Sequence, residues 1–351
     1  MNMQSAVLST YSDGAKEVQA DLCCPVDYDT SLLKMLPKEI VEKDYGCGDP
    51  SRYVREGDTV VDLGSGGGKI CYMAAHLVGD KGQVIGVDMN DDMLGLARKY
   101  QAEMAEKIGG DRVRFVKGHI QDLALDLDAL DQYLNDNPAN NVDAYNQMLA
   151  WQAQQRKNAP MIADNSVDLV ISNCVLNLVS DAEKMQLINE IFRVLKPGGR
   201  VAISDIVSDQ FVPDHLKADP ELWSGCISGA FQEQEFAEVF TNVGFTGARY
   251  DKWDMAPWKI VEDIEFRSVT LTASKPINSD SNDSHELIYK GPFAEVCDDD
   301  GNIFIRGEKT KVSPECHAAI SSGAFADAFV DIDADSASCC APAANEKPSC
   351  C

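Results

Sequence analysis

Short apolar runs alternate with amphipathic stretches over residues 58 to 206 of this chain. The runs are rich in valine and isoleucine, which predicts buried strands at 59–63, 83–88, 113–117, 167–172 and 200–206. Between them, apolar residues recur at helical intervals over 69–78, 91–100 and 181–195. Strands that alternate with helices predict an α/β fold, in which a mostly parallel, Rossmann-like sheet carries helices on both faces.

The segments around this core predict additions to the fold. Helical spacing over 14–22 and 28–42 predicts an N-terminal helical cap that covers residues 1–44. The stretch 124–160 is too long for a plain connection and predicts one or two inserted amphipathic helices. The turn Lys196-Pro197-Gly198-Gly199 predicts the end of the helix before it, because proline and glycine do not continue a helix. A helix over 222–244 and closing strands at 247–252 and 264–273 would complete a main domain of residues 45–275.

The character of the chain changes after about residue 277. The sequence NSDSNDSHE is typical of a linker, and two strand-like runs around Asp300-Gly301 predict a hairpin. We therefore expect a small C-terminal α/β or β segment over 276–330. The last stretch, 331–351, is small, polar and contains two cysteine pairs, which predicts a disordered tail.

Charge and apolar content narrow the range of partners. The formal net charge is −26, so nucleic acid and anionic membranes are poor partners, since a polyanion requires a basic surface. We find no apolar run of the roughly 18 residues that span a bilayer, and no secretory signal at the N-terminus. These features predict a cytoplasmic protein, and an uncharged substrate would meet no repulsion at its surface.

The sequence VVDLGSGGGKIC over residues 60–71 follows the first predicted strand directly. Glycine permits a sharp turn from strand to helix and lets a ligand approach bare backbone. Asp88 ends the second strand, at the distance where such folds place an acid that binds ribose hydroxyls. The glycine turn and Asp88 together predict a site for an adenosine-containing cofactor at the carboxyl edge of the sheet. The pattern GSGGG differs from the G-x-G-x-x-G of dinucleotide-binding proteins.

These pieces resemble the motifs of class I S-adenosylmethionine-dependent methyltransferases. The resemblance rests on VVDLGSGGG, on VIGVDMN at the second strand, on GHIQDL and on RVLKPGGRVAISD, and it covers residues 45 to about 273. It implies the class I methyltransferase fold and the methyl donor, but a fold does not specify the substrate.

Four of the twelve cysteines lie in apolar or glycine-flanked contexts: Cys47, Cys71, Cys174 and Cys226. Cys71 lies on the first helix, where we expect it to fill the core. Cys174 follows the fourth strand, and the other two adjoin glycines in segments able to fold over the same edge. Three converging thiolates suit trivalent arsenic, which keeps a lone pair able to attack a sulfonium methyl, whereas zinc prefers four ligands.

At this point the chain resembles a specific family, the arsenite S-adenosylmethionine methyltransferases. The motifs YGCGDP, SNCVLNLVSD and DPELWSGCISGAF carry the three cysteines in the family's order and spacing. The resemblance implies that Cys47, Cys174 and Cys226 bind arsenic(III), and that the cofactor contacts Tyr45, Asp62, Gly64, Ser65, Gly66, Asp88, Met89, Ile120, Gln121 and Asn173. It also implies arsenic detoxification by a monomer, with arsenite or its thiol conjugates as substrate and glutathione or thioredoxin as the thiol reductant.

The chain departs from the family at four places. Ser224-Gly225 precedes the last cysteine where an acidic residue is usual, and Gln121 replaces a common acid. The 124–160 insertion is additional, and the region after residue 277 does not match the family's usual C-terminal domain. These differences concern the preferred substrate and the number of methyl transfers more than the reaction.

The other cysteines and two rival functions stay open. Cys23 and Cys24 correspond to an N-terminal cysteine that the family uses in redox turnover, and the tail cysteines Cys339, Cys340, Cys350 and Cys351 form vicinal pairs that would gather metalloid ions. One rival is a methyltransferase that acts on selenium, tellurium, a thiol or organic carbon. The other is a protein that binds a metalloid without catalysis.

Overall fold

The computed structural model describes residues 3–19, 26–277, 285–298, 301–322 and 325–332 of the 351-residue chain. The chain divides into two compact units, Met1–Lys275 and Pro276–Cys351. Cys23, Cys24 and the four tail cysteines, for which roles were predicted, lie outside the described residues, as does most of the predicted tail. No described helix combines the length and the apolar character that crossing a membrane requires.

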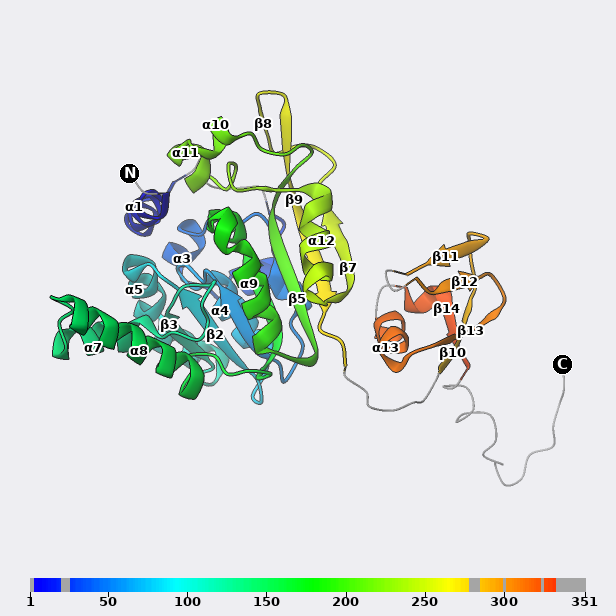
Figure 1. Cartoon of the computed structure of the whole chain (residues 1–351), viewed down its shortest axis with the longest axis horizontal. Helices are drawn as coiled ribbons and strands as arrows, with labels where there is room; N and C mark the ends of the chain where they lie inside the picture. Colours follow the sequence, from blue (N-terminus) through cyan, green and yellow to red (C-terminus); the bar gives the residue numbers. More distant parts are fainter. Residues whose placement is uncertain (1–2, 20–25, 278–284, 299–300, 323–324, 333–351) are drawn as a thin grey trace, which may run out of the picture. The chain divides into compact units, whose positions relative to one another are not determined.

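A nine-stranded sheet forms the centre of the first unit (Figure 1). Five parallel strands, in the order β3-β2-β1-β4-β5, continue into the antiparallel strands β9 and β7, while β6 pairs with β5 and β8 with β9. Their bounds are β1 Thr59–Leu63, β2 Gln83–Asp88, β3 Val113–Lys117, β4 Val167–Asn173, β5 Leu195–Ser208, β6 Phe231–Gln232, β7 Thr246–Trp253, β8 Lys259–Val261 and β9 Ile264–Ser274. The predicted parallel sheet and its two closing strands are thereby confirmed.

Helices cover both faces of this sheet, as the sequence predicted. Successive strand residues face opposite sides, so Val60 packs in one apolar cluster with α4–α6 and Val61 packs in another with α9 and α12. The bounds of these helices are α4 Lys69–Leu77, α5 Asp91–Lys99, α6 Gln101–Ile108, α9 Asp181–Val194 and α12 Glu233–Val243. The order 3-2-1-4-5 of the parallel strands places the carboxyl ends of β1, β2 and β4 side by side.

The inserted stretch between β3 and β4 forms two helices, α7 (Leu127–Asp136) and α8 (Val142–Asn158). Asp126 and Asn141 cap them by accepting hydrogen bonds from the backbone amides of Ala129 and Ala144. Neither helix has a fully buried residue, so the insertion lies on the surface of the unit.

Three predicted helix boundaries were wrong. The first helix, α1, spans Met3–Lys16 rather than 14–22, and 28–42 splits into α2 (Thr30–Leu33) and α3 (Lys38–Glu42) because Pro37 starts a new helix. The predicted helix 222–244 is broken after α11 (Pro220–Ser224), where Cys226 takes a left-handed φ of 60°.

The Lys196-Pro197-Gly198-Gly199 turn also differs from its prediction in one respect. Helix α9 does end just before it, at Val194, but the turn itself lies within the first residues of β5. The backbone amide of Gly198 donates to the carbonyl of Lys275, and the amide of Lys275 donates to the carbonyl of Gly199. The pairing with the end of β9 therefore extends the strand through the glycines.

The remaining short elements of the first unit are η2 Pro50–Tyr53, η3 Leu176–Leu178 and α10 Asp214–Lys217. The second unit contains β10 His285–Tyr289, β11 Glu295–Cys297, β12 Ile303–Ile305, β13 Lys309–Val312, α13 Pro314–Ser322, η4 Ala326–Ala328 and β14 Phe329–Asp331. The hairpin that we predicted is β11 paired with β12.

The Cys316-His317 pair helps to build the second unit. The Cys316 thiol is buried among Leu287, Tyr289 and Phe304 and donates to Asp298 Oδ2 at 3.3 Å. His317 Nε2 lies 2.6 Å from Asp331 Oδ2. These contacts give the pair a structural role in the second unit.

Candidate active site

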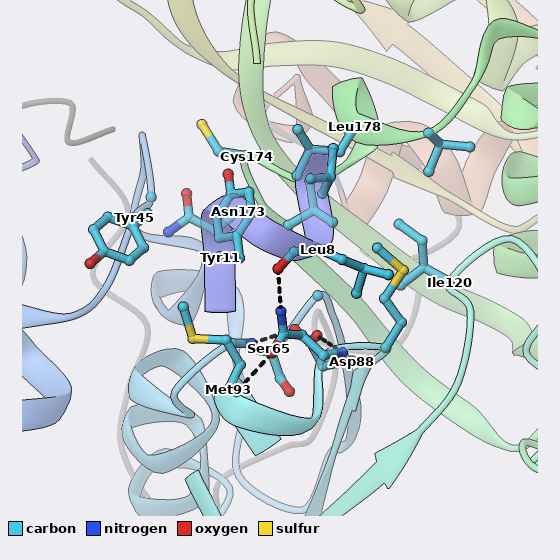
Figure 2. A pocket seen from close by; sticks show the side chains of 18 of the residues that line it. Leu8, Tyr11, Tyr45, Ser65, Asp88, Met93, Ile120, Asn173, Cys174 and Leu178 are labelled. Atoms are coloured by element: carbon cyan, nitrogen blue, oxygen red, sulfur yellow. Dashed lines mark hydrogen bonds between the residues drawn. The ribbon is translucent and has the colours of Figure 1, made fainter. Parts of the chain in front are cut away.

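A cavity of about 350 Å³ opens at the carboxyl ends of β1, β2 and β4 (Figure 2). It is the place where α/β folds bind ligands. All ten residues that the sequence assigned to the cofactor line this cavity: Tyr45, Asp62, Gly64, Ser65, Gly66, Asp88, Met89, Ile120, Gln121 and Asn173. The cavity is large enough for a ligand of the size of a nucleoside.

The glycine turn after β1 adopts the backbone conformation that the sequence predicted. Gly64, Gly66 and Gly68 have φ values of 68°, 50° and 86°, which side chains disfavour. A Cβ atom on Gly64 would lie 2.5 Å from the Val175 side chain. The turn therefore needs glycine both for its conformation and for the close approach of the β4 loop.

Asp88 fixes this turn to the end of β2. Its Oδ2 accepts a hydrogen bond from the Gly66 amide at 2.8 Å, and its Oδ1 accepts one from the Asn90 amide at 2.8 Å. Burial raises the pKa of this carboxyl, although the two amides oppose the shift. Each oxygen keeps a second lone pair, so Asp88 is able to accept the two hydroxyls of a ribose.

A buried carboxyl–thiol pair lies beneath the turn. The Cys71 thiol donates to Asp62 Oδ2 at 3.2 Å, and both side chains are buried. Burial raises the pKa of Asp62 to about 7 and also raises the pKa of Cys71. Cys71 packs in the apolar cluster between α4 and the sheet, so its predicted role as core filling is confirmed.

We predict that Asp62→Asn removes part of the pH dependence of stability. The folded protein keeps the Asp62 proton up to about pH 7, whereas an unfolded aspartate loses it near pH 3.8. The stability that the neutral carboxyl contributes is therefore complete below about pH 4 and is lost as pH rises toward 7. Urea unfolding should show the free-energy difference, variant minus parent, rising by roughly 3 kcal/mol between pH 5 and pH 7.

The matched control for this measurement is Asp143→Asn, at an exposed position on α8. It gives the baseline for removal of one exposed carboxylate at each pH. A difference for Asp62→Asn that does not rise above this baseline would show that Asp62 is ionised in the folded protein.

Helix α1 closes one side of the cavity, which the sequence analysis missed. Met3, Gln4, Val7, Leu8 and Tyr11 line the cavity. The signal available in the sequence was a set of small residues, Ala6, Gly14 and Ala15, which the structure shows to be buried. A Cβ atom on Gly14 would meet the Tyr45 ring at 2.8 Å, so the helix packs closely there.

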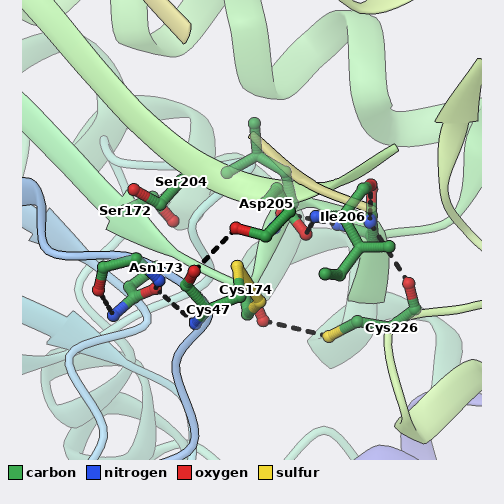
Figure 3. The surroundings of a disulfide bond; sticks show 12 residues. Cys47, Ser172, Asn173, Cys174, Ser204, Asp205, Ile206 and Cys226 are labelled. Carbon is green, nitrogen blue, oxygen red and sulfur yellow. Dashed lines mark hydrogen bonds between the residues drawn. A yellow bond between two sulfur atoms is a disulfide. The ribbon is translucent and has the colours of Figure 1, made fainter. Parts of the chain in front are cut away.

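Two of the three predicted thiols are joined in a disulfide, Cys47–Cys174, with their Cα atoms 5.9 Å apart (Figure 3). The third, Cys226, is buried, and its Sγ donates to the carbonyl of Cys174 at 3.1 Å. Cys174 and Cys226 have φ values of 59° and 60°, a conformation that costs a non-glycine residue about 1 kcal/mol or more. The surrounding contacts hold both cysteines in these unfavourable conformations.

The three sulfurs share one buried cluster but do not converge on a single point in this arrangement. Among the described residues, the potential ligand atoms that lie within 4.8 Å of one another belong to Cys47, Cys174 and Asp205. Cys226 stays outside this group because its thiol points to the Cys174 carbonyl. The predicted convergence of all three sulfurs is therefore not met while the disulfide is closed.

Asp205, at the end of β5, is the second feature that the sequence analysis did not assign. It is buried and accepts hydrogen bonds from the amides of Leu176 at 2.9 Å and Ile206 at 2.8 Å. Burial raises its pKa to about 7. Its position near the carboxyl end of the predicted strand 200–206, in the stretch RVAISD, was the signal available in the sequence.

Two asparagines, the half-buried Asn173 and the buried Asn177, hold the cysteine loops in place. Asn173 Oδ1 accepts from the amides of Cys47 and Gly48 at 2.9 and 3.0 Å, and Asn177 Nδ2 donates to the carbonyls of Cys226 at 3.2 Å and Ile206 at 2.7 Å. The side-chain amide of Asn173 thus holds the Cys47 loop, and the same residue lines the cavity.

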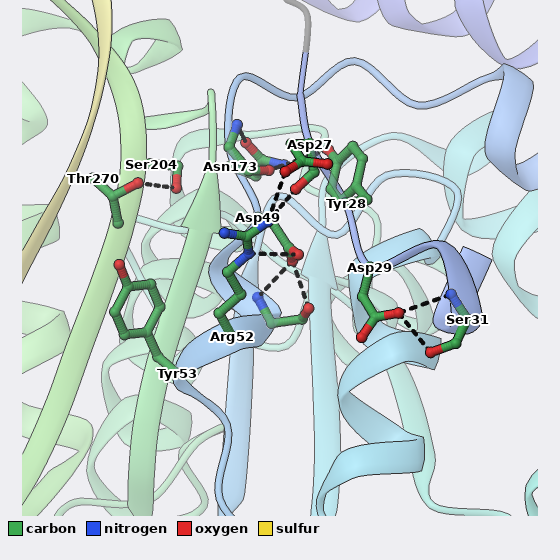
Figure 4. A network of polar contacts seen from close by, with 12 residues as sticks. Asp27, Tyr28, Asp29, Ser31, Asp49, Arg52, Tyr53, Asn173, Ser204 and Thr270 are labelled. Atoms are coloured by element: carbon green, nitrogen blue, oxygen red, sulfur yellow. Dashed lines mark hydrogen bonds and ion pairs between the residues drawn. The ribbon is translucent and has the colours of Figure 1, made fainter. Parts of the chain in front are cut away.

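A polar network fixes the chain just after Cys47 (Figure 4). The buried carboxylate of Asp49 accepts from Ser51 Oγ at 2.5 Å and from Arg52 Nε at 3.3 Å. The Ser268 hydroxyl on β9 donates to the Cys47 carbonyl at 2.7 Å. The Cys47 segment is therefore held from both sides, by its own turn and by the sheet.

Comparison with known proteins adds to this geometry. A methyltransferase domain model matches residues 55–156 and 147–244, and a domain of unknown function (DUF8838) matches 278–351. The chain is 29% identical to the arsenite methyltransferase of Mus musculus over 342 residues, which are 94% of this chain and 81% of that protein. It is 34% identical to the arsenite methyltransferase of Halobacterium salinarum over 244 residues, 67% of this chain and 51% of that protein.

Among solved structures, the chain resembles CrArsM, an arsenic(III) S-adenosylmethionine methyltransferase from Chlamydomonas reinhardtii. The TM-score is 0.59 at 28% identity, and the match covers 88% of this chain and 96% of the other. The similarity thus extends beyond the methyltransferase domain.

Proposed function

We infer that this chain, which belongs to the arsenite S-adenosylmethionine methyltransferase family, methylates trivalent arsenic held by its own thiols. The observation that carries the inference is the position of Cys174. It lines the cofactor cavity and also a small second cavity that contains Cys226 and Ile206. Tyr11 and Tyr45 line both cavities as well, but Cys174 is the only one of the three predicted thiols that does so.

The cavity fits S-adenosylmethionine. The positive-φ glycines leave bare backbone beside the cavity, Asp88 offers acceptor oxygens to a ribose, and Ile120 and Met93 supply apolar surface for a base. When bound, S-adenosylmethionine supplies an electrophilic methyl group. We assign its contacts to the ten residues that the sequence predicted, all of which line the cavity.

The thiols would bind arsenite by ligand exchange without a change of oxidation state. Each As–S bond that forms replaces an As–O bond, and the thiol proton leaves with the hydroxide as water. Arsenic then keeps its lone pair as the nucleophile, so no general base is required at arsenic. The apolar residues around the thiols, Ile206, Ile227 and Phe266, exclude water from this exchange.

The Cys47–Cys174 disulfide must be opened before arsenic binds, so the proposed cycle needs a thiol reductant such as glutathione or thioredoxin. Thiolate attack on the disulfide oxidises the reductant and releases both cysteines. A cytoplasmic location, where such reductants keep thiols reduced, suits this requirement. We propose arsenite or its thiol conjugate as the substrate of a monomeric enzyme.

Incubation of the reduced protein with arsenite and S-adenosylmethionine tests the function. We expect methylated arsenic species by liquid chromatography with mass detection, and S-adenosylhomocysteine in matching amount. Consumption of the donor without methylated arsenic would indicate another methyl acceptor. Arsenite binding without consumption of the donor would indicate a protein that only sequesters the metalloid.

A further inference from the structure

Helix α1 touches both the donor cavity and the third thiol. Its first three turns contribute Met3, Val7 and Tyr11 to the wall of the cavity. The same helix packs against α5 and against α11, the helix that leads into Cys226. Helix α1 therefore links the donor cavity to the segment that carries the third thiol.

On the donor side, two residues of the cavity wall hold this helix. Asn90 Nδ2 donates to the Leu8 carbonyl at 3.1 Å and to Ser12 Oγ at 3.1 Å. The Tyr45 hydroxyl donates to the Gly14 carbonyl at 2.9 Å. Asn90 lies two residues after Asp88, and Tyr45 lies two residues before Cys47, so these contacts link α1 to the donor site.

On the thiol side, the Tyr11 hydroxyl is the contact. It lies 3.5 Å from the Ser224 carbonyl and 4.0 Å from Cys226 Sγ. The ring packs edge-on against the Tyr45 ring, with centroids 6.1 Å apart. Tyr11 also lines the second cavity, together with Cys174 and Cys226. Its ring therefore faces the donor, while its hydroxyl faces the third thiol.

We propose that Tyr11 is a positioning residue that orients Cys226 for arsenic and couples this orientation to occupation of the donor cavity. A ligand in the cavity packs against the Tyr11 ring and fixes α1, and the hydroxyl then holds the Cys226 segment where its sulfur completes the three-thiol site. Because coupling between two sites is reciprocal, arsenic bound at Cys226 would in turn favour binding of the donor. This inference rests on the proposed function.

The coupling is measured with S-adenosylhomocysteine, which occupies the cavity without transferring a methyl group. Arsenite affinity of the reduced full-length protein is determined by equilibrium dialysis, with and without saturating S-adenosylhomocysteine. We expect the affinity of the parent protein to rise by roughly tenfold with the nucleoside, as is typical of coupled sites. In Tyr11→Phe, which keeps the ring, we expect a rise of less than about twofold.

Two further variants separate positioning from a general structural role. Cys226→Ala should lose the coupling by itself, and Tyr11→Phe added to it should change nothing more. The matched control Tyr145→Phe, on α8 with the side chain 50% exposed, should keep the parent value. Full coupling in Tyr11→Phe, an additive effect in the double variant, or no coupling in the parent would each overturn the proposal. Failure of the proposed function is distinct, because it shows as an absence of methylated arsenic in the assay with S-adenosylmethionine, whereas the coupling is measured from arsenite binding without methyl transfer.

Discussion

Replacing Cys174 by serine should lower kcat/KM for arsenite methylation by at least about 100-fold, which corresponds to roughly 3 kcal/mol of lost transition-state stabilisation. A serine hydroxyl is a hard ligand that binds arsenic(III) poorly compared with a thiolate. Cys174 is also the one proposed arsenic ligand that lines both the donor cavity and the thiol cavity, so its loss removes the ligand nearest the donor. The rate of formation of methylated arsenic by the reduced protein gives the measurement.

The donor site should survive this substitution. Affinity for S-adenosylhomocysteine, measured by calorimetry, should change by less than about threefold, because the amides of the glycine turn and Asp88 are untouched. The matched control is Cys297→Ser, an exposed cysteine of the second unit, which should keep the parent activity. Arsenite methylation that persists in Cys174→Ser would exclude the thiol site as the place of reaction.

Protein that retains the Cys47–Cys174 disulfide should form methylated arsenic at less than about 1% of the rate of reduced protein. The disulfide occupies two of the three proposed ligands, and a single thiol at Cys226 holds arsenic(III) too weakly for turnover. The experiment compares aliquots with and without a dithiol reductant that is removed before the assay. Peptide mapping under non-reducing conditions reports how much of the Cys47–Cys174 link remains in each.

The recovery of activity should follow the loss of that link. Among the described cysteines, Cys47 and Cys174 are the two that the structure joins in a disulfide, so reduction of this link is the change that the assay follows. Cys47→Ser supplies the control, because it removes the disulfide without restoring the third ligand and should stay inactive with or without reductant. Equal rates for the linked and reduced protein would mean that arsenic binds elsewhere.

Much of the donor site was predictable because its determinants are local. Each of the five parallel strands was visible as a run rich in β-branched residues, and most of the residues assigned to the cofactor lie at the ends of β1 to β4 or shortly after them. Parallel strands bring these ends to one edge whatever the intervening helices contain. That is why all ten residues assigned to the cofactor line one cavity.

The positions of α1 and of the break at Cys226 could not be predicted in the same way. Helix α1 takes its place through Asn90 and Tyr45, which are distant in the sequence, and its own pattern carries no strong apolar face. At residues 222–244 the helical spacing was real on both sides of the break. Only the tertiary contacts, such as the bond from Asn177 to the Cys226 carbonyl, hold the left-handed turn between them.

The sequence by itself determined which chemistry is present: a glycine turn and an acid for an adenosine cofactor, and three cysteines in separate motifs. The tertiary structure alone decided how the sulfurs are arranged. Cys47 and Cys174 are 127 residues apart, and they meet because Asn173 binds the Cys47 backbone. The Cys226 thiol donates a hydrogen bond to the Cys174 carbonyl, and its sulfur therefore does not join the other two sulfurs. Local patterns encode the residues that a site needs, whereas distances between sulfurs depend on contacts that form only when the whole chain has folded.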